Sequence, residues 1–327
     1  MKLPRCRFLH VAAAAAALLS AVILAGGSAS AQVSRTIKIV VPVPPGGGLD
    51  FLVRLLADQI GRTQGVTFVV ESRPGAGGRI AAEAVSHLPP DGTNLLTTFP
   101  SLVIDPHVRK VNYDPLRSFE PICKLVDAPN VIVVTGASPY RTLAELMNAA
   151  RAKPGDLMMA SIGPASNQHI AIARQKRTSN IDLTYVPYPG SAPAVNALLG
   201  EHVTSLFAAY ANVGEQIATG RLRALAAATA NRIEALPDVP SVAESGFADF
   251  AVDNWFGVVA PARTPKEIVA QIADWFLAAL QVPDIKAKLA VQGLYPAGIC
   301  GADFAALLRK QDEEFGRAIR ETNMRVE

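Results

Sequence analysis

Two glycine-rich turns stand where a strand-like run gives way to a helix-like one. They are "PPGGGLD", residues 44–50, and "RPGAGGR", residues 73–79. Such turns aim backbone N–H groups and the positive end of a helix dipole at an anion. Neither is a phosphate motif, because the chain has no Gly-Lys pair and the G-x-G-x-x-G spacing is not met. The first turn predicts a small-anion site or a tight turn that needs glycine for its backbone alone. For the second turn we favour the backbone interpretation.

Two further turns precede helix-like runs later in the chain. They are "ASIGPASNQHIAIA", residues 160–173, and "YPGSAPA", residues 188–194. In the first of them Ser166 and Asn167 occupy N-cap positions, and Gln168 and His169 lie in the first turn, so these groups are either carboxylate donors or local caps. Ser166 and His169 also have the types of a nucleophile and a base. They lack an acidic neighbour in sequence and a Gly-x-Ser-x-Gly elbow, so we expect no enzyme.

The elements that position these turns form two α/β units. Strand-like and helix-like stretches alternate in a βαβαβ rhythm, which indicates mostly parallel sheets flanked by helices. The rhythm restarts after Pro129, and the chain is expected to return near Val252. The predicted lobes are therefore 32–130 with 252–327, and 131–251. Two crossings make a hinge, and the cleft between lobes is the expected ligand site.

The first 31 residues have the layout of a secretory signal peptide. A basic start precedes the apolar run of residues 8–24, and Ala29-Ser30-Ala31 offers a cleavage site before Gln32. We therefore expect export to the periplasm. The segment holds three of the 31 Lys and Arg residues and no acidic ones, which leaves 28 basic against 28 acidic residues. A neutral mature chain predicts no binding to nucleic acid.

Few residues in the chain could hold a metal or form a crosslink. Only Cys123 and Cys300 remain after the signal peptide, and an oxidising compartment permits a disulfide between them. Two cysteines far apart in sequence are also often simply buried, so both alternatives stay open. There is no C-x-x-C and no histidine pair with metal spacing. We predict no metal site and no cofactor.

Several long motifs in a fixed order resemble the substrate-binding receptors of the tripartite tricarboxylate transporters, the Bug family. The resemblance covers nearly the whole mature chain. The motifs are "VPVPPGGGLDFLVRLLADQI", "VVESRPGAGGRIAAEAV", "PPDGTNLL", "NYDPLRSFEPI", "VPYPGSAPAVNALLGEHV", "GRLRALAAATANRIEALPDVPSVAESG" and "NWFGVVAPARTPKEIV".

The resemblance implies a monomeric, two-lobed periplasmic binding protein, type II-like, that closes around a small organic carboxylate and delivers it to membrane permease subunits. Presentation of the closed form to a membrane sensor kinase is the alternative. In similar proteins the first glycine loop and the Ser-x-x-His loop reach one carboxylate. The residues expected to contact the ligand are Pro45, Gly46, Gly47, Leu49, Phe99, Ser101, Ser166, Asn167, His169, Ser191 and Ala208.

Two departures from the family pattern bear on the ligand. Ala208 and Ala209 follow Phe207 where an acidic residue is frequent, so a partner for an amino group is missing. Pro189 stands where a basic residue is frequent, which argues against a tricarboxylate. Phe99, placed near the cleft, suits an apolar group. We therefore expect a monocarboxylate with an apolar body.

Overall fold

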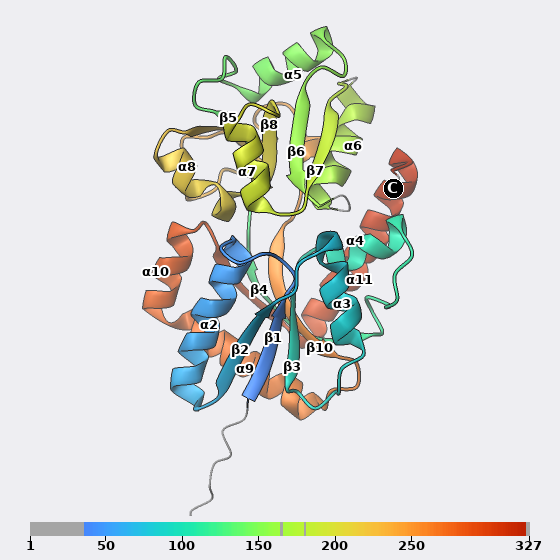
Figure 1. Cartoon of the computed structure of the whole chain (residues 1–327), viewed down its shortest axis with the longest axis vertical. Helices are drawn as coiled ribbons and strands as arrows, with labels where there is room; N and C mark the ends of the chain where they lie inside the picture. The colour runs from blue at the N-terminus through green and yellow to red at the C-terminus, as the bar shows by residue number, and fades with distance from the viewer. Residues whose placement is uncertain (1–35, 164–165, 180, 325–327) are drawn as a thin grey trace, which may run out of the picture. The chain divides into compact units, whose positions relative to one another are not determined.

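The structure is a computed structural model that describes residues 36–163, 166–179 and 181–324. The predicted signal peptide and its cleavage site lie outside the described residues. Two separate β-sheets organise the chain, one of six strands and one of five. Each sheet with its flanking helices is called a lobe below, the first lobe holding the six-stranded sheet (Figure 1).

The first sheet takes its strands from both ends of the chain. Their spatial order is β11 (Tyr295–Cys300), β4 (Phe119–Asp127), β10 (Trp255–Pro261), β3 (Asn94–Thr98), β1 (Thr36–Val41) and β2 (Thr67–Ser72). Strand β1 pairs in parallel with β2 and β3, whereas β10 is antiparallel to both β3 and β4. The two-lobed α/β class is confirmed, but the sheet is mixed where we predicted a mostly parallel one.

The second sheet is built from the middle of the chain. Its order is β7 (Thr184–Tyr188), β6 (Met158–Ile162), β8 (Ser205–Ala209), β5 (Asn130–Thr135) and β9 (Leu222–Ala227). Strands β6, β7 and β8 are parallel, and β5 is antiparallel to both of its neighbours. The antiparallel strands of both sheets lie beside the crossings, because a strand that returns from the other lobe enters against the direction of the βαβ units.

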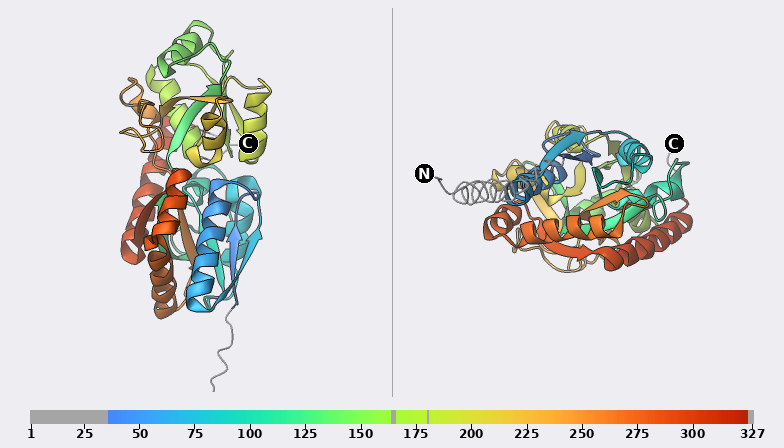
Figure 2. Two further views of the ribbon diagram at one scale, coloured as in Figure 1. Left: turned by 90° about the vertical axis from the view of Figure 1, so that its left-hand side faces the viewer. Right: turned by 90° about the horizontal axis from the view of Figure 1, so that it is seen from below.

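Helices cover both faces of each sheet (Figures 1 and 2). On the first sheet, one face carries α2 (Gly48–Gln64), α9 (Lys266–Gln281) and α10 (Pro283–Val291), and the other carries α3 (Arg79–Ser86), α4 (Ser101–Val108) and α11 (Gly301–Thr322). On the second sheet, α5 (Leu143–Ala152) and α6 (Asn167–Ser179) pack opposite α7 (Ser191–Leu199) and α8 (Gly214–Ala218).

Alternation along the strands decides which core each side chain joins. In β1, Ile37, Ile39 and Val41 pack against Leu52 of α2, while Val40 faces the opposite core. This is the period-2 geometry of a strand whose two faces are both buried. Three short 3-10 segments complete the fold: η1 (Ala76–Gly78), η2 (Tyr210–Asn212) and η3 (Ala248–Phe250).

The chain passes between the lobes at two adjacent places. Strand β4 leads through Ala128 and Pro129 into β5, and Val252 to Asn254 lead back into β10. The crossings are bound to each other, because Ala128 N donates to Asn254 O at 2.9 Å. The described residues form one compact unit. A paired connection of this kind is the expected geometry of a hinge.

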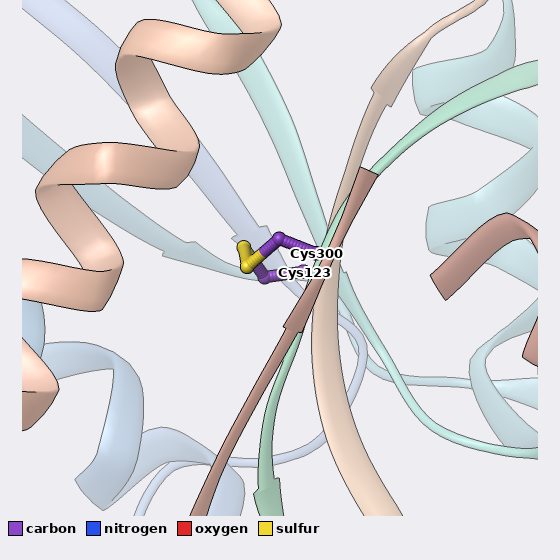
Figure 3. The surroundings of a disulfide bond; sticks show 2 residues. All are labelled: Cys123 and Cys300. Carbon is purple, nitrogen blue, oxygen red and sulfur yellow. A yellow bond between two sulfur atoms is a disulfide. The ribbon is translucent and has the colours of Figure 1, made fainter. Parts of the chain in front are cut away.

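The two cysteines of the mature chain form a disulfide within the first lobe. Cys123 of β4 lies opposite Cys300 of β11 in the antiparallel register, and their sulfur atoms are 1.99 Å apart (Figure 3). Strand β11 lies between α10 and α11, in the C-terminal part of the first lobe. The bond joins the last strand, 177 residues later in the chain, to the strand that leads into the hinge.

Candidate functional site

A cavity that is partly open to solvent lies between the lobes. Residues of both lobes line it, at the ends of strands and the starts of helices. They are Val43, Pro44, Gly47, Gly48, Leu49, Phe99, Ser101, Ile162, Ser166, Asn167, Gln168, Gly190, Ser191, Ala209, Asn212, Asn254 and Phe256. This position between two lobes is where ligands of hinged proteins are expected.

The start of α2 forms one wall of the cavity. Gly47 is its N-cap residue, with extended backbone at φ −88° and ψ 170°. The Gly48 N–H donates to Asn212 Oδ1 of the second lobe at 3.0 Å, and the Gly46 N–H donates to Asp50 Oδ2 at 3.1 Å. A helix cannot satisfy the N–H groups of its own first turn. The wall therefore carries backbone donors and the positive end of the α2 dipole.

The start of α7 faces it from the second lobe. Gly190 is the N-cap residue of α7, and Ser191 is its first residue. A Cβ placed on Gly47 would lie 3.5 Å from Ser191 Oγ, and one on Gly190 would lie 3.2 Å from Pro44 Cγ. The two helix starts are therefore close together, with glycine at the points of closest approach. Opposed helix N-termini can stabilise one anion by hydrogen bonds and by dipole.

The start of α6 also reaches the cavity, but its donors are already in use. Ser166 Oγ accepts the His169 N–H at 3.2 Å, and Asn167 Oδ1 accepts the Gln168 N–H at 3.1 Å. Ser166 Oγ also lies 3.3 Å from Ser161 Oγ. The sequence left open whether Ser166 and Asn167 bind a carboxylate or cap the helix locally. In this structure both side chains act as caps.

Seven of the eleven residues predicted to contact a ligand line the cavity. They are Gly47, Leu49, Phe99, Ser101, Ser166, Asn167 and Ser191. The first glycine turn and the Ser-Asn stretch thus meet from opposite lobes, as the resemblance implied. The second glycine turn is outside the cavity. Its three glycines all have positive φ, from 70° to 134°, in agreement with the backbone interpretation.

Four predicted residues do not line the cavity. Pro45 and Gly46 are exposed on the outer side of the first turn. The His169 ring stacks on Tyr185, with ring centroids 3.8 Å apart. Ala208 is 1% exposed and packs on the α7 side of the second sheet. Strand alternation explains this last correction, since the next residue, Ala209, ends the strand and reaches the cavity instead.

Sequence reasoning missed several residues that the fold brings to the cavity. They are Val43, Pro44, Gly48, Ile162, Gly190, Ala209, Asn212, Asn254 and Phe256, whereas Gln168 was a first-turn candidate that the expected ligand contacts left out. Gly48 and Gly190 could have been predicted, because they belong to glycine turns that were identified in the sequence. No local signal marks Asn212 or Asn254, which follow a strand and precede one. Only the approach of the two lobes places them at the site.

The lining is uncharged and largely apolar. Among the described residues that line the cavity there is no Asp, Glu, Lys, Arg or His side chain. Phe99 and Phe256 supply aromatic surface, and Ser, Asn and Gln side chains with backbone groups supply the polar contacts. Within the described ranges, no group of three or more His, Cys, Asp or Glu residues could hold a metal ion. An anion here would be stabilised by neutral donors and helix dipoles alone.

Comparison with known proteins gives one family. Residues 52–324 match the model of the tripartite tricarboxylate transporter family receptor. The chain is 34% identical to the "UPF0065 protein in tcbD-tcbE intergenic region" of Pseudomonas sp. (strain P51), over 88% of this chain and 86% of that protein. It is 30% identical to "Protein BugT" of Bordetella pertussis, over 91% of this chain and 93% of that protein.

Two solved structures with bound ligands are similar over nearly their whole length. One is Rpa4515 of R. palustris with adipate, with a TM-score of 0.85, 29% identity and coverage of 90% of this chain and 99% of that one. The other is MatC (Rpa3494) of Rhodopseudomonas palustris with bound malate. Its TM-score is 0.79 at 27% identity, covering 87% of this chain and 99% of that one.

Proposed function

Because the chain belongs to the tripartite tricarboxylate transporter receptor family, we propose that it captures a small organic carboxylate between its lobes and releases it unchanged to membrane permease subunits. One observation carries the proposal. The N-termini of α2 and α7 oppose each other across an uncharged cavity, with Gly47 close to Ser191. Similar proteins with bound adipate and malate support the ligand class.

The proposed contacts follow from this geometry. One carboxylate group lies between the starts of α2 and α7, where first-turn N–H groups have no acceptor within their own helices. Phe99 and Phe256 contact the apolar part of the ligand. An ionised carboxylate is a stronger acceptor than a neutral oxygen, so backbone donors suffice to hold it. Closure then removes the ligand from water and strengthens each of these contacts.

The site supports binding rather than catalysis. Ser166 Oγ accepts the His169 N–H while the His169 ring stacks on Tyr185, so the serine serves as a helix cap. Nucleophilic catalysis needs the ring to act as a base on that oxygen. We also propose that the protein works as a monomer in the periplasm after removal of residues 1–31, with lobes at 32–130 with 252–327 and at 131–251.

Titration calorimetry of the mature chain tests the proposal. A panel of mono-, di- and tricarboxylates should yield at least one ligand with saturable heat and one site per chain. Mass spectrometry of the released ligand should recover it intact. Absence of binding across the panel, or chemical turnover of the ligand, would overturn the proposed function.

A further inference from the structure

Four carboxamide side chains form a cluster at one side of the cavity. Asn167, Gln168 and Asn254 line the cavity, and Asn130 lies behind them, fully buried at the start of β5. All four are less than 9% exposed. Each donor and acceptor of a buried amide needs a hydrogen-bond partner from the protein, from water or from a ligand.

Two of these amides are satisfied within the protein. Asn167 Nδ2 donates to Asp253 O at 2.9 Å, and Asn167 Oδ1 accepts the Gln168 N–H. Asn254 Nδ2 donates to Ala128 O at 2.7 Å, and Asn254 Oδ1 accepts from Asn167 Nδ2 at 3.4 Å. These bonds tie the start of α6 to both crossings. The amide nitrogen and oxygen of both side chains therefore each make at least one bond within the protein.

Gln168 differs from them. Its Nε2 donates to Asn130 Oδ1 at 3.0 Å, and Asn130 does not line the cavity. One N–H of Gln168 is therefore directed away from the cavity. Gln168 itself lines the cavity, and its carbonyl oxygen Oε1 is the acceptor that it offers to a ligand. An amide oxygen can accept two hydrogen bonds.

Asn130 Oδ1 favours this orientation of Gln168. Turning Gln168 over by itself would set Gln168 Oε1 against Asn130 Oδ1, two acceptors at hydrogen-bonding distance. The backbone of Asn130 is held in the sheet, where it pairs with Ala209 and its carbonyl accepts the Ala228 N–H at 2.8 Å. The cavity therefore combines a position for an anion at the starts of α2 and α7 with a neutral acceptor, Gln168 Oε1, in the carboxamide cluster.

We propose that Gln168 is a specificity-determining residue, whose Oε1 accepts a hydrogen bond from a hydroxyl group of the ligand. The ligand class is then a hydroxycarboxylate with an otherwise apolar body. The proposal rests on the proposed function. A hydroxyl is favoured over an ammonium group because no lining side chain carries a negative charge, and an ammonium buried without a counter-charge is strongly disfavoured.

Matched ligands test the inference. Unsubstituted monocarboxylates of three to eight carbons first select the chain length, and calorimetry then compares that acid with its hydroxy, amino and oxo derivatives. The wild-type protein should bind at least one hydroxy acid about 3- to 10-fold more tightly than the unsubstituted acid, the value of one neutral hydrogen bond. In Gln168→Met, which keeps the length of the side chain, this ratio should fall to about one.

A second variant separates the acceptor from packing. Gln168→Glu keeps an oxygen toward the cavity, and Asn130 Nδ2, which has no hydrogen-bond partner within the described part of the chain, can turn to donate to it. All carboxylates should bind Gln168→Glu more weakly, because the new charge repels them, but the preference for the hydroxy acid should remain. Ser191→Ala is the matched control, since it should weaken both acids alike and leave the ratio unchanged.

Three results would overturn the inference while leaving the proposed function intact. They are an equal affinity of the wild-type protein for the hydroxylated and unsubstituted acids, a hydroxyl preference that persists in Gln168→Met, and a preference for the oxo acid. The last would mean that Gln168 presents a donor. If no carboxylate binds, the proposed function itself fails. Thermal melts of each variant exclude misfolding as the cause.

Discussion

The backbone N–H of Gly48, in the first lobe, donates a 3.0 Å hydrogen bond to the side chain of Asn212 in the second. Packing makes the contact tight, because a Cβ on Gly48 would lie 2.5 Å from Ala211 Cβ. The same helix start that offers donors to an anion is thus held by the opposite lobe. The contact between the lobes and the candidate anion site therefore share the start of α2.

Removal of this contact should favour the open form. Asn212→Ala deletes the acceptor of the Gly48 N–H, and one such hydrogen bond is worth about 0.5–1.5 kcal/mol. Ligand affinity should therefore fall about 2- to 12-fold, as measured by calorimetry. Small-angle scattering of the unliganded variant should show a larger radius of gyration than the wild type. Unchanged affinity and radius would mean that the bond does not contribute to closure.

A side chain at Gly47 should block the approach of the lobes. Its φ of −88° suits any residue, but a Cβ there would lie 3.3 Å from Asn212 Oδ1. Gly47→Val adds two further carbons toward this contact, so affinity should fall about ten- to 150-fold if one charge-assisted bond is lost. The melting temperature without ligand should stay near that of wild type. Wild-type affinity in this variant would refute the assignment of the first turn as the anion site.

Gly46→Ala is the matched control for that variant. Gly46 has a φ of +90°, and nothing lies within 4 Å of a Cβ built on it. The substitution is strained by its backbone alone, which should lower the melting temperature. It adds no atom to the cavity, so affinity should fall less than in Gly47→Val. The two neighbouring glycines should therefore separate loss of binding from loss of stability.

His169 should matter through packing. Its ring stacks on Tyr185 at an interplanar angle of 9°, and Tyr185 OH donates to Gly163 O at 2.5 Å. His169→Ala should lower the free energy of unfolding by roughly 0.5–1.5 kcal/mol, the value of an aromatic pair. The change in affinity should be small and equal at pH 5.5 and pH 8. A large loss that appears at only one of these pH values would show that the ring itself contacts the ligand.

The disulfide should stabilise the first lobe. Cys123–Cys300 closes a long loop between β4 and β11, and such crosslinks contribute about 2–4 kcal/mol. Cys300→Ser should lower the melting temperature, and wild-type protein treated with reductant should melt like the variant. Alkylation of unreduced, denatured wild-type protein should modify no cysteine of the mature chain. Two alkylated thiols would favour the alternative of simply buried cysteines.

Asp105 should make stability depend on pH. It is 1% exposed, and burial raises its pKa to about 6, although Arg109 lies 2.8 Å away and opposes the shift. The folded state then holds a proton that the unfolded carboxyl, with a pKa of about 3.9, releases. Stability from this group is present below about pH 4 and is lost as pH rises to about 6.

Comparison of melts isolates this contribution from other groups. Between about pH 4 and pH 6, the free energy of unfolding of Asp105→Asn should fall less, or rise more, than that of the wild type, by roughly 2–3 kcal/mol across the interval. Parallel curves for the two proteins would show that Asp105 does not titrate in this range.

The sequence by itself determined the class of fold and the turns that form the site. The β-branched run 37–43 and the amphipathic run that begins at Asp50 encode their elements locally, because burial of both faces of a strand or one face of a helix fixes the type and spacing of apolar residues. The place of the glycines in the first turn could be predicted for the same reason, since a strand followed directly by a helix needs a sharp turn. The long motifs, taken together in their fixed order, then indicated the family.

Tertiary structure decided the partners of these elements. Strands β4 and β11 pair antiparallel beside a crossing, a long-range choice that no local pattern records, and their pairing brings Cys123 to Cys300. Gln168 donates to Asn130, which lies 38 residues earlier in the chain, and this contact exists only after the second lobe has folded. Asn212 gained its role only from the approach of the other lobe. Sequence specifies backbone tendencies over a few residues, whereas a site between two lobes depends on contacts that exist only after both have folded and met.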